Sequence, residues 1–162
     1  MSVSFVRIDD RVIHGQIVVV WSKIRPCDGI IAVDDDIAKD KVLSMVYKNA
    51  APVGVKAVVL SVAEGLQKLP QAQGSKKNYF IIAKTPITLA KLVQGGFELG
   101  VKKINVGPMS SRDGAITVGS NACVTPEEAK AFDVLVEAGY EIEFQLVPEK
   151  KAYTWESVRD KF

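Results

Sequence analysis

The chain has 162 residues, of which 48% are hydrophobic and 25% are charged, a balance typical of a soluble globular protein that buries one core. We therefore expect a single domain spanning residues 1–162. The net charge of +2, with Lys and Arg scattered along the chain, argues against nucleic-acid binding. The longest apolar run, residues 17–21, is far shorter than the roughly 20 residues that cross a bilayer.

The N-terminus shows no signal-peptide pattern, so we expect a cytoplasmic protein that does not insert into the membrane. The two cysteines, Cys27 and Cys123, are far apart and form no C-x-x-C pair. With a single histidine in the chain, this argues against a structural zinc site and fits a reducing compartment.

Apolar runs of strand length alternate with helical patterns along the chain. A strand at Val3–Ile8 is followed by a helix at 15–23. Further strands are expected at 29–33, 56–60, 79–83 and 103–106. The strict alternation of 141–146 predicts a strand with one wet face, near an edge of the sheet.

The helices are predicted mainly from residues typical of helix ends. Asp35 or Asp36 can cap a helix whose apolar residues recur at helical spacing. Those residues are Val42, Leu43, Val46 and Tyr47. Thr85-Pro86 predicts a helix start, and Thr125-Pro126-Glu127-Glu128 predicts a capping box. A short helix closes the chain at 154–162, and the polar stretch 71–77 is expected to be a surface loop.

This alternation predicts an α/β fold with a doubly wound, mostly parallel sheet and helices on both faces. In such sheets ligands bind beyond the carboxyl ends of the strands. Four polar loops fall there, and they supply the candidate rim of a site. The rim candidates are Asp9, Asp34, Thr85, Gly107 and Arg112.

The only histidine, His14, lies in the loop after the first strand, in Arg7-Ile8-Asp9-Asp10-Arg11-Val12-Ile13-His14-Gly15-Gln16. A neutral imidazole is a nucleophile at pH 7, and Arg11 can bind phosphate oxygens. The backbone amides of Gly15 and Gln16 would face an anion at a helix N-terminus.

Asp9 or Asp10 could orient the imidazole, as carboxylates do beside catalytic histidines. A purely structural histidine, and a turn or cap role for the aspartates, remain the alternatives. No G-x-x-x-x-G-K-[ST] or G-x-G-x-x-G motif is present, which argues against a nucleotide-binding loop.

The segment from Arg7 to Gln16, followed by Trp21, closely resembles the signature loop of sugar phosphotransferase system (PTS) IIB subunits of the mannose/fructose/sorbose family. Other matching segments are spread over most of the chain. They are Val33-Asp34-Asp35-Asp36, Ala51-Pro52-Val53-Gly54-Val55, Lys84-Thr85-Pro86, Gly95-Gly96 and Ile104-Asn105-Val106-Gly107.

The resemblance implies an α/β fold with about seven strands and a phosphohistidine at His14. It also implies a phosphocarrier that takes the group from a IIA partner and passes it to sugar at a IIC/IID membrane complex. Transfer of this kind needs no metal or other cofactor. Homo-oligomers are left open, and the transported sugar is not specified by this chain.

Two other functions fit the same architecture. An aspartate-phosphorylated receiver domain would need an acceptor carboxylate after the third strand, where this chain has Leu60-Ser61. A regulatory binding module without phosphate chemistry would not need the pair Arg11 and His14.

Overall fold

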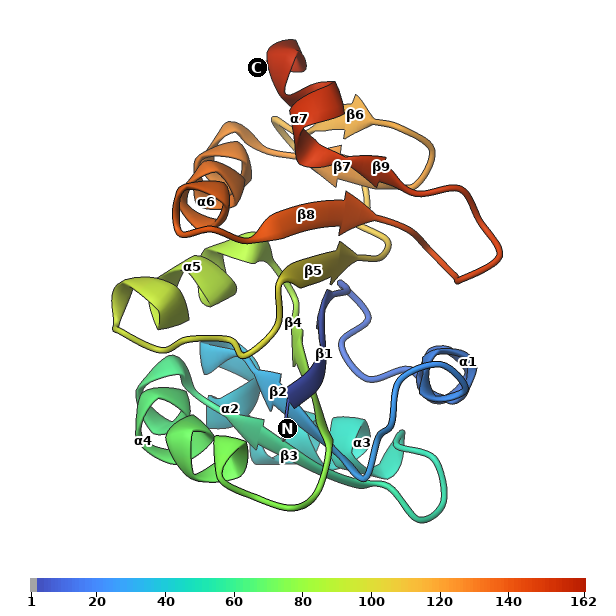
Figure 1. Ribbon diagram of the computed structural model, residues 1–162, viewed down its shortest axis with the longest axis vertical. Coiled ribbons are helices and arrows are strands. Elements are labelled where there is room, and N and C mark those ends of the chain that lie inside the picture. The colour runs from blue at the N-terminus through green and yellow to red at the C-terminus, as the bar shows by residue number, and fades with distance from the viewer. Residues whose placement is uncertain (1–2) are drawn as a thin grey trace.

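The computed structural model describes residues 3–162, and its centre is a seven-stranded sheet in the order β3-β2-β4-β1-β5-β8-β9 (Figure 1). All neighbouring strands are parallel except β8 and β9, which are antiparallel. The strands of this sheet are β1 (Val3–Ile8), β2 (Gly29–Val33), β3 (Lys56–Leu60), β4 (Tyr79–Ala83), β5 (Lys103–Val106), β8 (Glu141–Phe144) and β9 (Tyr153–Thr154). The expected strands are therefore present, and β8 lies next to the edge strand, as its alternation predicts.

Helices pack on both faces of the sheet. They are α1 (Gly15–Ser22), α2 (Asp35–Lys39), α3 (Lys41–Asn49), α4 (Val62–Gln73), α5 (Pro86–Gln94), α6 (Pro126–Glu137) and α7 (Trp155–Val158), with a final 3₁₀ turn at Arg159–Lys161. In Figure 1, α4, α5 and α6 lie on one side of the strands and α1 on the other. The predicted doubly wound α/β class is confirmed.

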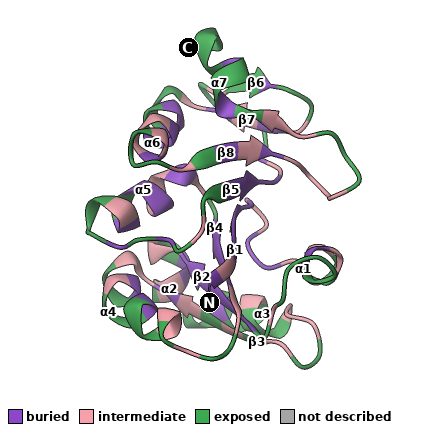
Figure 2. Ribbon diagram, in the orientation of Figure 1, coloured by how far each residue is buried: buried purple, intermediate pink, exposed green. Residues whose placement is uncertain are grey.

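Alternate residues of the central strands supply two separate cores. On β4, Ile81 belongs to the core that includes side chains of α4, α5 and α6, whereas Phe80 and Ile82 belong to the core that includes side chains of α1, α2 and α3. Figure 2 shows the buried central strands between helices whose outer surfaces are exposed. Because both faces are covered, these strands are apolar throughout, as parallel strands usually are.

The helix expected after β2 is two helices, with caps other than those predicted. Asp34 caps α2 by accepting a hydrogen bond from the Ile37 amide at 2.9 Å, and Asp40 caps α3 in the same way. Asp35 instead accepts from the amide of Val62 at 2.8 Å. The expected cap at Asp35 or Asp36 was wrong because the chain turns into the helix one residue earlier.

The apolar spacing of α3 predicts the wrong buried face of this helix. Its buried residue is Ser44, whose hydroxyl donates to the Ile37 carbonyl at 2.7 Å, while Val42 and Val46 are 74% and 57% exposed. Tyr47 does pack against the core. The short α2–α3 corner sets the rotation of α3, and this tertiary constraint overrides the hydrophobic pattern.

Several other details differ from the sequence expectation. The helix α4 was not predicted, and it includes residues 71–73 of the expected surface loop. A separate two-stranded hairpin, β6 (Ile116–Val118) and β7 (Ala122–Val124), was also missed. Thr85 precedes α5 but forms no side-chain cap, whereas the capping box of Thr125 and Glu128 is confirmed.

Candidate functional site

The loop that carries His14 leaves the carboxyl end of β1, between β4 and β5. The Asp9 amide donates to the Ala83 carbonyl at the end of β4 at 2.9 Å. The Asp10 amide donates to the carbonyl of Pro108, just after β5, at 3.2 Å. The chain after β1 enters α1 on one face, while α5 after β4 lies on the other. The loop therefore lies at a topological switch point, where doubly wound sheets bind ligands.

The backbone of this loop is strained immediately before His14. Val12 has a φ of +61°, which is a genuine outlier for a β-branched side chain. Val12 and Ile13 are 2% and 3% exposed and are packed in the core beneath α1. Burial of these two side chains holds the loop in a conformation that the free chain would avoid.

His14 is the N-cap residue of α1. Its backbone is extended, its carbonyl accepts from the Val18 amide at 3.1 Å, and its imidazole does not cap the helix. The N–H groups of Gly15 and Gln16 lie in the first helical turn, where no intrahelical acceptor exists. Within residues 3–162, the buried Nδ1 of His14 has no hydrogen-bond partner.

The packing around Gly15 is also tight. A Cβ at this position would lie 3.0 Å from the carbonyl oxygen of Ala50, just after α3. The start of α1 is therefore pressed against the end of α3, which fixes the direction in which its first amides point.

Asp9 is 1% exposed and binds two arginines at once. Its carboxylate accepts from Arg7 Nε at 3.2 Å, and from the amide, Nε and Nη2 of Arg11 at 2.9, 3.1 and 3.0 Å. The hydrogen bonds that the Arg11 side chain donates to Asp9 raise the pKa of Arg11 above its ordinary value. Asp9 thus contacts the arginines and not the imidazole.

Arg7 is buried in the sheet and was not identified from the sequence. It is 1% exposed, and it donates to Asn105 Oδ1 and to the carbonyls of Gln145 and Leu146 at 3.2 and 3.0 Å. Burial lowers its pKa from the ordinary value of arginine. The available signal was an arginine inside an otherwise apolar strand, because such a charge needs buried partners.

Gly107, a predicted rim residue, makes room for that arginine. A Cβ on Gly107 would lie 2.6 Å from the Arg7 guanidinium carbon, far inside van der Waals contact. Its role in this structure is therefore to let the guanidinium pass beneath the loop after β5.

A cavity of about 320 Å³ is lined by three other residues that the sequence predicted for the site. They are Asp10, Thr85 and Arg112, joined by Lys84, Met109, Ser110 and Glu128. Asp10 accepts from the Ser110 amide at 2.7 Å, and Arg112 pairs with the buried Glu128. The expected contact between Asp10 and the imidazole is not formed, and Asp34 serves as the cap of α2.

A family model described as "PTS system sorbose subfamily IIB component" matches residues 3–161. The chain belongs to this family. It is 31% identical over 148 residues to the fructose-specific EIIB component of Bacillus subtilis, covering 91% of this chain and 90% of that protein. It is 32% identical over 147 residues to the mannose-specific EIIAB component of Escherichia coli, covering 91% of this chain and 45% of the longer protein.

The fold agrees with this membership. The IIB domain of the sorbose permease from Klebsiella pneumoniae superposes with a TM-score of 0.89 at 28% identity, over 99% of this chain and 98% of that one. The IIB chain is thus a component of a sugar-transport phosphotransferase system, as the loop resemblance implied. No helix among residues 3–162 is both long and apolar enough to cross a membrane.

Proposed function

We propose that this IIB chain carries a phosphoryl group on His14, taken from a phosphorylated IIA partner and passed to sugar at a IIC/IID membrane complex on the cytoplasmic side. The observation that carries the proposal is the position of the only histidine. His14 stands at the N-terminus of α1, beyond the carboxyl end of β1, directly after a strained residue and on the loop that holds Arg11. Each of these features favours a bound anion or a functional loop.

The transfer exchanges one phosphorus–nitrogen bond for another. A neutral imidazole nitrogen of His14 attacks phosphorus in line, and the bond to the donor's nitrogen breaks as the new one forms. Each imidazole keeps the proton on its other nitrogen, so no external base is needed. Donor and acceptor are of similar energy, and catalysis therefore rests on positioning and on stabilising the charge of the transferred group.

Arg11 can stabilise that charge without leaving Asp9. A guanidinium has five N–H donors, and Asp9 occupies one at Nε and one at Nη2. The others remain for phosphate oxygens, and the side chain is 37% exposed. Asp9 therefore holds the planar group in one orientation, which reduces the entropy lost when phosphate binds.

A cysteine is a weaker candidate for the phosphorylated residue. Burial raises the pKa of the Cys27 thiol to about 11, so that it is protonated near neutral pH and a poor nucleophile. Cys123 lies on β7 and its sulfur contacts the hydroxyl of Thr117. Neither thiol belongs to the β1–α1 loop.

A receiver-like function lacks its acceptor. The position after β3 is Ser61, whose hydroxyl caps α4 by accepting from the Glu64 amide at 3.1 Å. Its side chain is thus committed to helix capping and carries no carboxylate.

Labelling from phosphoenolpyruvate, through the general phosphotransferase proteins and a matching IIA, tests the proposal. Wild-type protein is expected to gain a label that is lost in acid and kept in base, and His14→Ala to gain none. Gln16→Ala is the control, because it changes a side chain of the same segment but keeps the backbone amide, and it is expected to be labelled as wild type is. Acid-labile label on His14→Ala would show that another residue carries the group. A base-labile label on wild type would indicate an acyl phosphate, and no label a binding module.

Arg11→Lys separates phosphate binding from charge alone. Lysine keeps the charge but loses the planar fork, so we expect transfer to slow about tenfold, equivalent to ~1.4 kcal/mol of transition-state stabilisation. Arg159→Lys, on the C-terminal 3₁₀ turn, is the control. Wild-type rates for Arg11→Lys in rapid-quench assays at subsaturating donor would remove Arg11 from the reaction.

A further inference from the structure

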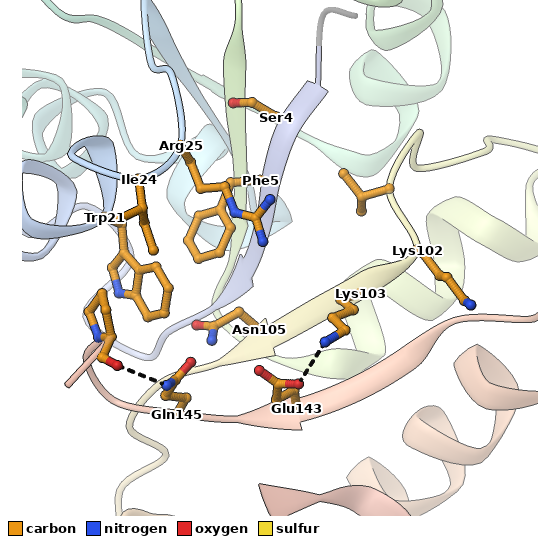
Figure 3. A pocket seen from close by; sticks show the side chains of 12 residues that line it. Ser4, Phe5, Trp21, Ile24, Arg25, Lys102, Lys103, Asn105, Glu143 and Gln145 are labelled. Carbon is orange, nitrogen blue, oxygen red and sulfur yellow. Dashed lines mark hydrogen bonds and ion pairs between the residues drawn. The ribbon is translucent and has the colours of Figure 1, made fainter. Parts of the chain in front are cut away.

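A second cavity, of about 430 Å³, lies on the α1 side of the sheet over β1, β5 and β8. Its walls include Phe5, Trp21, Arg25, Lys103, Asn105 and Gln145 (Figure 3). None of these residues was a candidate for phosphoryl transfer. Its volume is in the range of small-molecule sites.

The charge of this cavity favours an anion. Its lining carries three cations, Arg25, Lys102 and Lys103, against the single carboxylate of Glu143. Lys103 is paired with Glu143 at 3.2 Å and Lys102 with Glu141 at 3.3 Å, whereas Arg25 forms no ion pair within residues 3–162. Figure 3 shows Arg25 pointing into the cavity and Lys102 pointing away. An unpaired guanidinium at the mouth of a cavity suits a phosphate group.

The remaining walls suit a hydroxyl-rich body. Asn105 uses Oδ1 to accept from Arg7, and Gln145 uses Nε2 to donate to the Lys150 carbonyl at 2.7 Å. Their other amide atoms, Asn105 Nδ2 and Gln145 Oε1, have no hydrogen-bond partner in the described part of the chain. Asn105 Nδ2 can therefore donate to a ligand, and Gln145 Oε1 can accept from one. The stacked rings of Phe5 and Trp21, 4.8 Å apart, form an apolar wall.

We propose that this cavity binds a small phosphorylated polyol of the sugar phosphate class, with the phosphate on Arg25 and hydroxyl groups on Asn105 and Gln145. Binding reaches the β1–α1 loop through a continuous chain of contacts. Asn105 accepts from Arg7, Arg7 donates to Asp9 at 3.2 Å, and Asp9 holds Arg11. Arg7 also lies over the Trp21 ring, 5.5 Å from its centre. Any effect of this binding on phosphoryl transfer rests on the proposed function of His14. Binding to the cavity does not rest on it.

Isothermal titration of the wild-type chain with glucose 6-phosphate tests the site. Saturable binding is expected, with glucose and inorganic phosphate each at least about tenfold weaker because each lacks half of the contacts. Arg25→Gln is expected to weaken binding about tenfold or more. Lys23→Gln removes an exposed cation two residues before Arg25, just after α1 and outside the cavity; it is the matched control and is expected to bind as wild type does.

Three results would overturn the assignment. They are no saturable binding to wild type, equal affinity of Arg25→Gln and wild type, and inorganic phosphate binding as tightly as glucose 6-phosphate. The last would reveal a simple anion site without recognition of the polyol.

The coupling has its own readout, because the chain has a single histidine and its ring proton signals therefore report on His14 alone. Glucose 6-phosphate is expected to shift the NMR signals of the His14 ring in wild type and not in Arg25→Gln at the same concentration. Unshifted signals at saturation would overturn the coupling. This experiment needs no phosphorylated partner, so failure of the proposed function leaves its outcome unchanged.

Discussion

Replacing Asp9 with asparagine tests the buried cluster beneath the candidate site. Asp9→Asn conserves the size of the side chain but removes the negative charge between Arg7 and Arg11. The side chains of Arg7 and Asp9 are 1% and 2% exposed, so water cannot replace the lost partner. Arg7 would keep its bonds to Asn105 and to the carbonyls of Gln145 and Leu146, but with no anion beside it.

The expected cost is large for a substitution that conserves shape. Removing one partner of a buried ion pair costs about 3–5 kcal/mol, and the remaining hydrogen bonds of Arg7 place this case near 3 kcal/mol. Since ~1 kcal/mol shifts the melting temperature of a chain of this length by about 2–4 °C, we expect a loss of about 6–12 °C. Arg11 is 37% exposed and adds little, because water can solvate it.

Urea unfolding of Asp9→Asn, wild type and Asp10→Asn is the assay. Asp10 is half-buried and accepts from Ser110, so Asp10→Asn is expected to cost only about 1 kcal/mol. If Asp9→Asn unfolds within ~0.5 kcal/mol of wild type, the reasoning is refuted. The dipoles around Arg7 would then stabilise its charge without Asp9.

Two further substitutions probe features that the structure alone revealed. Gly107→Ala is expected to lower the free energy of unfolding by about 2 kcal/mol, because the added Cβ would displace the Arg7 guanidinium. Gly74→Ala is the neutral control in the same urea assay, since a Cβ there would lie 3.7 Å from its nearest neighbour, the Gln71 carbonyl oxygen. Arg159 hydrogen-bonds Asp133 at 2.8 Å and lowers the pKa of that carboxyl below 3.8, so wild type is expected to be more stable than Arg159→Gln above that pH. This advantage is lost as the pH falls through the folded pKa of Asp133, and an advantage that did not shrink as the pH was lowered from 3.8 in melting experiments would contradict the assignment.

Local features of the fold could be predicted because their physics is local. The continuous apolar runs of β2 and β4 identify strands covered on both faces, and the capping box of Thr125 and Glu128 identifies the start of α6. By contrast, the hairpin of β6 and β7 has only three residues in each strand, too short for a clear alternation. The outward rotation of α3 depends on its corner with α2 and carries no signal in the hydrophobic pattern.

The same division applies to the candidate site. The sequence by itself determined which groups the first loop brings together, because the proposed nucleophile, the cation and the helix start all lie within ten residues, from Arg7 to Gln16. Only the tertiary structure decided how the charges are shared. Asp9 binds Arg7 and Arg11 instead of the imidazole, and Gly107, about one hundred residues away along the chain, is needed for Arg7 to fit. A buried charge must be satisfied by whatever groups the packed strands bring beside it, and those groups are neighbours only in three dimensions.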